Sequence, residues 1–207
     1  RLDGIEVIKG SAALKYGPQT MGGVINYITH RPRSTFGGLA QATVGTNNFY
    51  SFVTEVGGWG TKNIFPEIQL LYKSGDGFRD NNHFNQLNGT FKVSISPNEK
   101  TDVYIKANIN HEFSHATYTG LTEYSFYNNP EFNPKEDDTF EVFRASLDIL
   151  SKKQINSRII STTKAYKYHF NRQWWRENDV FVDADIYTGD TVIPVPWYNS
   201  GDLMRIG

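Results

Sequence analysis

The chain has 207 residues with 21 basic and 22 acidic side chains, and its net charge of −1 argues against a nucleic-acid partner. It contains no cysteine, so disulfides and thiolate metal sites are excluded, and no run approaches the roughly 18 apolar residues of a membrane-spanning helix. Aromatic residues make up 14% of the chain, while the mean hydropathy is −0.51. This composition favours an all-β fold, including a membrane β-barrel, whose strands hide their apolar face by alternation.

The beginning of the chain predicts two short strands joined by a helical turn. The expected strands carry β-branched side chains and cover residues 5–8 and 23–29. Residues 10–16 predict the helical turn, with Ser11 as its N-cap. The pair Gly22-Gly23 permits positive φ or a close approach of two backbones just before the second strand.

The remainder of the chain consists of alternating apolar and polar segments. The clearest is 87–96, where Leu87, Phe91 and Val93 share one face and Asn88, Thr90 and Lys92 share the other. Similar or weaker alternation covers residues 39–44, 50–56, 67–73, 103–113, 141–150 and 158–174. We therefore expect about seven strands of roughly ten residues, the length of a tilted membrane-spanning strand.

The predicted connections alternate between short and long in the later part of the chain. Residues 97–101 and 151–156 predict tight turns, whereas 114–138 and the segment from 177 onward predict long loops. Short turns at one end and long loops at the other are typical of outer-membrane barrels, and a soluble sandwich has no such bias. Since seven strands leave two unpaired edges, we expect the chain to be a fragment of a larger barrel.

Residues 5–29 resemble the end of the plug domain of TonB-dependent outer-membrane receptors. The resemblance rests on the segments IEVIKG, AALKYGP and GGVINYIT, and departs from the family pattern at Ser11, where proline is common. It implies that residues 1–33 are the C-terminal part of a plug and that 34–207 are the N-terminal part of a transmembrane antiparallel β-barrel of about 22 strands.

The same resemblance implies a function and a set of partners. Such a receptor binds an extracellular ferric chelate and imports it into the periplasm of a Gram-negative bacterium, using energy from the inner-membrane TonB complex. The expected partners are this complex, outer-membrane lipid and the ferric chelate as the transported ligand, with no nucleic acid and no resident cofactor.

A narrower resemblance points to the ferric-citrate branch of this family. It rests on four segments, namely YGPQ with the following GGVINY, residues 114–122, residues 133–138 and residues 170–176. Ferric dicitrate is therefore the expected cargo. The alternatives are another siderophore, haem or a nickel chelate, or a soluble extracellular β-protein that binds carbohydrate or acts as an adhesin.

An anionic ferric chelate needs fixed cations, and the planar guanidinium of arginine matches carboxylates best. Arg172 and Arg176 lie at the end of the last predicted strand, where they are candidate ligand-binding residues. The alternative is that both extend to lipid headgroups beside neighbouring tryptophans. Alternation places Arg172 with Tyr168 and Phe170 on the expected outward face, which favours the alternative.

Three further residues are weaker candidates for ligand binding. Arg144 lies on the polar face of its strand, where it can contact ligand or instead pair with Asp148 or the plug residue Glu6. Arg79 lies in a loop of the long side, and Gln19 lies in the plug turn, where a plain turn role is the alternative.

No residue constellation predicts catalysis or a metal site. His111 and His115 are four residues apart, but that spacing presents a metal pair only on a helix, and here it spans a strand end and a loop. The sequence shows no nucleophile–base pair, no phosphate-binding glycine loop and no paired carboxylates at catalytic spacing. We therefore do not expect an enzyme.

Overall fold

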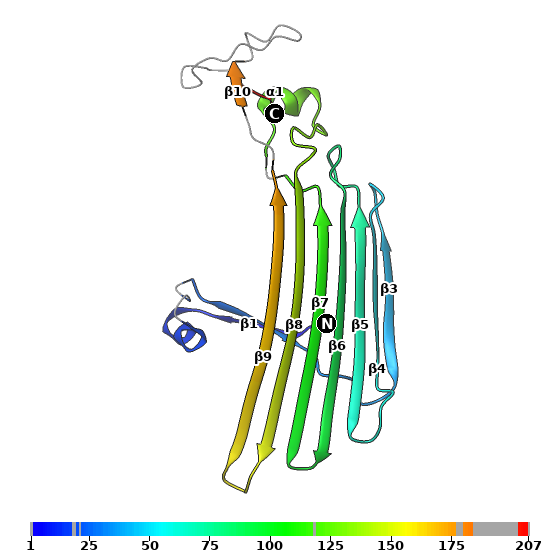
Figure 1. The fold of residues 1–207 in the computed structure, drawn as a ribbon, viewed down its shortest axis with the longest axis vertical. Coiled ribbons are helices and arrows are strands. Elements are labelled where there is room, and N and C mark those ends of the chain that lie inside the picture. The colour runs from blue at the N-terminus through cyan, green and yellow to red at the C-terminus, as the bar shows by residue number, and fades with distance from the viewer. Residues whose placement is uncertain are drawn as a thin grey trace.

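The computed structural model describes residues 2–17, 20, 22–117, 119–176, 180–183 and 203–206. Seven strands form one antiparallel sheet in which every strand pairs with its neighbours in the sequence (Figure 1). The strands are β3 (Gly37–Val44), β4 (Tyr50–Gly57), β5 (Ile64–Gly75), β6 (Phe84–Asn98), β7 (Thr101–Ser114), β8 (Thr139–Gln154) and β9 (Ile160–Trp175). The predicted strands are therefore confirmed, although most are longer than their alternating segments.

Residues 2–29 form a separate two-stranded sheet, here called the N-terminal unit. Strand β1 (Leu2–Ile8) pairs antiparallel with β2 (Val24–Thr29), and the 3₁₀ helix η1 (Gly10–Tyr16) lies between them. Gly23 has a φ of 101°, and a Cβ there would lie 2.8 Å from the carbonyl oxygen of Ile8. The positive φ and the close backbone approach that the glycine pair permits are thus both found at Gly23. The prediction of a Ser11 cap is wrong, because the helix begins after Lys9 without a side-chain cap.

The connections differ between the two ends of the large sheet (Figure 1). At one end, β6 and β7 are joined at Glu99 and Lys100, inside the predicted turn 97–101, whereas β8 and β9 are joined by residues 155–159, so the turn predicted at 151–156 is displaced toward the C-terminus. At the other end, the long connection after β7 contains helix α1 (Glu123–Asn128), whose first turn is capped by Thr122. Beyond β9, strands β10 (Val180–Asp183) and β11 (Leu203–Ile206) pair with each other.

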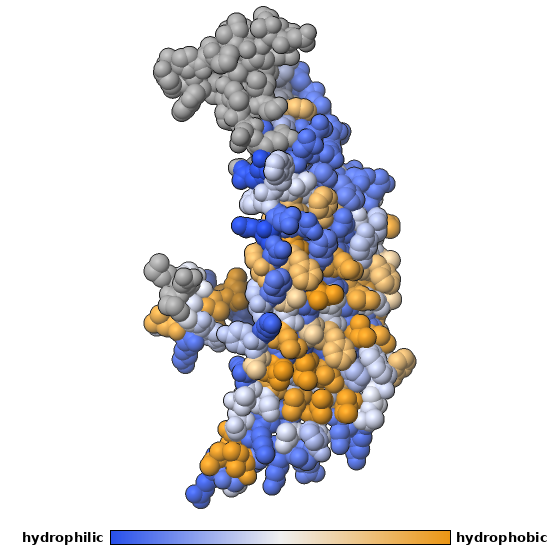
Figure 2. Space-filling model, in the orientation of Figure 1, coloured by the Kyte–Doolittle hydropathy of each residue, from blue (hydrophilic) through white to orange (hydrophobic). Residues whose placement is uncertain are grey.

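The burial pattern is the reverse of that of a water-soluble core. Among the described residues, the buried apolar set is only Ala13, Val93 and Val142, whereas the buried polar set includes Glu55, Glu67, Gln69 and Lys92. Large apolar side chains are exposed along the strands, and Figure 2 shows them as a hydrophobic band across the middle of the sheet, with hydrophilic surface above and below. In the described part of the chain, no helix has the length and apolar character needed to cross a membrane.

The pairing register defines which side chains share each face of the sheet. The face that contacts the connection from the N-terminal unit is here called the inner face, and it carries Glu67, Lys92 and Asn108. The opposite face carries exposed apolar residues, namely Leu70, Leu87, Phe91, Ile109, Phe143 and Leu147. The predicted separation of polar and apolar faces is confirmed for β6 to β8.

Strand β9 departs from the predicted orientation. Arg144, on the inner face of β8, pairs directly with Phe170, so Phe170 and its alternate neighbours Tyr166, Tyr168 and Arg172 also lie on the inner face. The prediction that they face outward is wrong. The turn between β8 and β9 sets this register, since the amide of Ile155 donates to the carbonyl of Ile159 over 2.9 Å.

Candidate functional site

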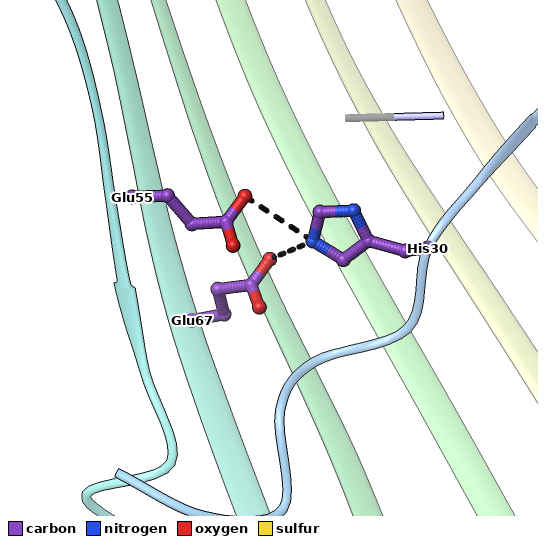
Figure 3. A group of neighbouring side chains, drawn as sticks. All are labelled: His30, Glu55 and Glu67. Carbon is purple, nitrogen blue, oxygen red and sulfur yellow. Dashed lines mark hydrogen bonds and ion pairs between the residues drawn. The ribbon is translucent and has the colours of Figure 1, made fainter. Parts of the chain in front are cut away.

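The first four residues of the connection between β2 and β3, residues 30–33, hold the N-terminal unit against the inner face of the sheet. This segment follows β2 directly and is here called the linker. Figure 3 shows His30 of the linker pointing toward Glu55 of β4 and Glu67 of β5. The Nε2 atom of His30 lies 2.8 Å from Glu67 and 3.3 Å from Glu55.

Both carboxylates are buried and make several further contacts. Glu67 has no exposed surface, and it lies 3.4 Å from the ammonium of Lys92, which is 1% exposed. Glu55, 6% exposed, accepts hydrogen bonds from Nε and NH2 of Arg33 over 3.0 and 2.8 Å. The amide nitrogen of Gln69 lies 2.8 Å from an oxygen of each carboxylate and joins the two halves of the cluster.

Backbone contacts add to this attachment of the linker. Lys92 donates to the carbonyl oxygen of His30 over 3.1 Å, and the amide of Arg33 donates to Glu67 over 3.2 Å. Arg31 lies over the ring of Tyr104 at 4.1 Å and within 3.9 Å of Asp102. The linker is therefore joined to four strands of the sheet, β4 to β7.

Among the described residues, the cluster is also the group of side chains best placed to hold a metal ion. The donor atoms of His30, Glu55 and Glu67 lie within 4.8 Å of one another, a spacing compatible with a divalent cation. However, Arg33 and Lys92 already balance the two carboxylate charges. The charge balance favours an ion-pair network that fastens the linker, since a buried carboxylate needs compensation and here has it without a metal.

Sequence reasoning missed this cluster. Its signal was present, because Glu55 and Glu67 are acidic residues inside predicted strands, on the polar side of the alternation. An acidic side chain at such a position needs a cationic partner when it is buried. The basic segment HRPR at residues 30–33 was the available partner.

The candidate arginines at the end of β9 gather around one tryptophan. The guanidinium of Arg172 lies 5.7 Å from the ring of Trp174, and that of Arg176 lies 5.0 Å from the same ring. Trp174 also contacts Phe140 edge to face, with ring centroids 5.6 Å apart. Both Arg172 and Arg176 are exposed, and Arg172 lies on the inner face of β9.

Arg144 lies on the same inner face, one strand away. Its guanidinium lies 5.6 Å from the ring of Phe170, which is stacked on Tyr168. Within the described residues no carboxylate lies within ion-pair distance of Arg144, so the expected pairing with Asp148 is not formed. Glu6, the other expected partner, instead accepts a hydrogen bond from Asn26 of the N-terminal unit.

Arg79 is placed apart from the other candidate arginines. It lies in the loop after β5 and donates to the carbonyl oxygen of Thr119 over 2.8 Å, which joins this loop to the long loop after β7. Asn82 makes a parallel link to the carbonyl of His115 over 2.8 Å. Arg79 thus stabilises the contact between two loops. Gln19, the remaining candidate, lies outside the described residues.

A carboxylate in the loop after β5 also joins that loop to its neighbour. Asp76 accepts hydrogen bonds from the side chain of Asn48 and from the ring of His83, which lies 3.3 Å away. These two donors hold the pKa of Asp76 below its ordinary value, because they favour the charged carboxylate. Side-chain hydrogen bonds therefore connect the loops at this end of the sheet to one another.

The fold is that of the TonB-dependent receptor barrels, a class that the motifs in residues 5–29 resemble. No family model matches the chain. The crystal structure of the ferric citrate transporter FecA in the unliganded form is similar, with a TM-score of 0.74, 18% identity, and coverage of 87% of this chain and 28% of that one. The ferric-catecholate import receptor Fiu from E. coli K12, in its open form, matches with a TM-score of 0.74 and 15% identity, over 90% of this chain and 31% of that one. The chain therefore spans less than a third of either solved structure.

Proposed function

We propose that the chain is part of an outer-membrane transporter of the TonB-dependent class that imports a ferric chelate into the periplasm of a Gram-negative bacterium. In this proposal, residues 1–33 belong to a plug and residues 34–207 to the barrel wall that surrounds it. The expected partners are the TonB complex, which supplies energy, outer-membrane lipid and the chelate itself.

The reversed burial pattern carries this proposal. Glu67 and Lys92 are buried on the inner face, whereas Leu87 and Phe91 are 47% and 41% exposed on the other. An exposed apolar band bounded by polar ends matches the hydrocarbon layer of a membrane and would be a liability in water. A soluble carbohydrate-binding protein or adhesin would need a second layer to cover this face. The likeness to two import receptors supports the same conclusion.

Ferric dicitrate is the proposed cargo, and Arg144, Arg172 and Arg176 are the proposed contacts. The three guanidinium groups lie on or near the inner face at β8 and β9, beside exposed aromatic rings. Carboxylate-rich chelates are recognised by such groups through paired hydrogen bonds. The sequence resemblance to the ferric-citrate branch supports this choice over haem, a nickel chelate or another siderophore.

Binding of ferric dicitrate to the detergent-solubilised full-length protein tests this proposal. We expect saturable binding, weakened by more than tenfold, about 1.4 kcal/mol, in the double variant Arg172→Ala, Arg176→Ala. Arg158→Ala, at the turn on the other end of β9, is the matched control and should bind normally. Retained binding in the double variant would refute the site, and absence of binding in the unaltered protein would refute the cargo.

Dependence on TonB is tested separately in cells. Uptake of radioactive iron should stop when TonB is deleted, while surface binding of the chelate persists. Equal uptake in the two strains would overturn the transport proposal. Recovery of the protein in solution without detergent would favour the soluble alternative.

A further inference from the structure

A cavity of about 450 Å³ lies between the N-terminal unit and the inner face of the sheet. Leu2 and Thr29, which are paired at the open end of the β1–β2 sheet, line it on one side. Four strands of the large sheet line the other side, through Gln69, Asn88, Thr90, Lys92, Lys106, Asn108 and Ser146. Its volume lies within the range of roughly 300–1,000 Å³ typical of small-molecule sites.

The charged residues that line this cavity are both basic. Lys92 and Lys106 both line it, and no carboxylate is among its lining residues. The two lysines are direct cross-strand partners in β6 and β7. Like charges in directly opposed positions destabilise a sheet unless a counter-charge offsets them.

The two lysines differ in how far they are already neutralised. Lys92 is engaged by Glu67 and by the carbonyl of His30. Lys106 forms no ion pair within the described residues, although Asp148 lies opposite it in β8. Lys106 therefore supplies the cavity with a positive charge that no carboxylate of the described residues approaches within 4.0 Å.

Neutral hydrogen-bonding groups surround the lysines in a fixed arrangement. The amide of Asn108 donates to the hydroxyl of Thr90 over 2.7 Å and to the carbonyl of Gly89 over 3.1 Å. The hydroxyl of Thr90 lies 3.5 Å from the side-chain oxygen of Asn88. These hydrogen bonds fix the polar lining of the cavity and engage the amide of Asn108, so the ammonium of Lys106 is the donor left for an oxyanion.

We propose that this cavity is an inner binding site for a small polycarboxylate anion, with Lys106 as its principal charged contact. The inference rests on the proposed transport function and adds a second binding site along the transport path. An anion released from the arginines near Trp174 would occupy the cavity beside the linker before it leaves the barrel. The recognised chemistry is the carboxylate, whether free citrate or its ferric chelate supplies it.

Chemical protection of a cysteine in the cavity tests the proposal. Ser146→Cys is introduced into the full-length protein, with any cysteine outside residues 1–207 replaced, since this chain has none of its own. Its rate of reaction with a small thiol reagent is measured with citrate, ferric dicitrate or the uncharged polyol sorbitol. At a ligand concentration ten times the dissociation constant, we expect citrate or its chelate to slow the reaction roughly tenfold. The reason is that the unliganded fraction of the protein is then the reciprocal of one plus the ratio of ligand concentration to dissociation constant.

Additional substitutions in the Ser146→Cys protein identify which lysine is responsible for the protection. Lys106→Gln should abolish the protection, whereas Lys164→Gln, which removes an exposed lysine of the inner face of β9, should leave it unchanged. Protection by citrate, by the chelate or by both supports the site. Equal protection by sorbitol, lack of protection by either anion, or unchanged protection in Lys106→Gln would overturn it. TonB-dependent uptake is measured in parallel, so that loss of the inner site and failure of the transport proposal give different results.

Discussion

The Nε2 atom of His30 lies 2.8 Å from Oε1 of Glu67, and this carboxylate has no solvent-exposed surface. The two residues are separated by 37 positions in the sequence, one in the linker and the other inside β5. Their contact places the end of the N-terminal unit against the inner face of the sheet. Lys92 and Gln69 contact the same carboxylate of Glu67, so several side chains of the sheet fix the linker to the inner face.

Replacing Glu67 should weaken the fold more than most single substitutions. In Glu67→Ala the buried ammonium of Lys92 loses its carboxylate, and removal of one partner of a buried pair costs about 3–5 kcal/mol. The free energy of unfolding of the full-length protein, measured by denaturant titration in lipid vesicles, gives this cost. Glu99→Ala, in an exposed turn, is the control and should change stability by less than about 0.5 kcal/mol.

A double variant distinguishes the effect of an unpaired buried charge on stability from the effect of lost packing. The double variant Glu67→Gln, Lys92→Met removes both charges and should recover part of the stability lost by Glu67→Gln alone. If the double variant is as unstable as the sum of its two single variants, the ion pair is not the cause of the loss.

The two adjacent glycines before β2 should respond differently to the same substitution. Gly23→Ala forces an L side chain to φ 101° and brings its Cβ within 2.8 Å of the Ile8 carbonyl, so we expect a loss of about 1–3 kcal/mol. Gly22→Ala meets no described atom within 4 Å and should be nearly neutral. Hydrogen exchange of the amides of residues 24–29 reports the difference, and equal exchange in the two variants would contradict it.

The contact between the loops after β3 and β5 should weaken in acid. Hydrogen bonds from Asn48 and His83 lower the pKa of Asp76, so its contribution to folding is complete above the ordinary aspartate pKa and is lost as pH falls through the lowered value. Carbon NMR of the Asp76 carboxyl should therefore give a midpoint below the ordinary value. Asn48→Ala should raise it, whereas the distant Asn128→Ala should not, and an unchanged midpoint in Asn48→Ala would exclude this hydrogen bond as the cause.

The orientation of β9 can be tested with spin labels in a lipid bilayer. Tyr168 lies on the inner face and its neighbour His169 on the opposite face, so a label at Tyr168→Cys should be more accessible to a polar nickel reagent. A label at His169→Cys should be more accessible to oxygen dissolved in the lipid. The reverse result would mean that β9 is displaced by one residue relative to β8, since a one-residue shift exchanges the faces.

The sequence by itself predicted the strands and most of their faces. Alternation is a local property with a period of two, so segments such as 87–96 and 103–113 predict both a strand and its polar side without knowledge of their neighbours. The glycine pair before β2 likewise indicated a position where positive φ is permitted, and Gly23 adopts it, whereas its close approach to Ile8 depends on the pairing of β1 with β2. The likeness to receptor barrels confirms the fold that these patterns predict.

The tertiary structure alone decided which distant residues meet. The orientation of β9 depended on its register with β8, since its aromatic residues alternate equally well with either face. The cluster of His30, Glu55 and Glu67 depended on where the linker crosses the sheet, a relationship between segments that no local pattern encodes. The cavity beside Lys106 arises for the same reason, because its lining comes from the N-terminal unit and four strands that only the fold brings together.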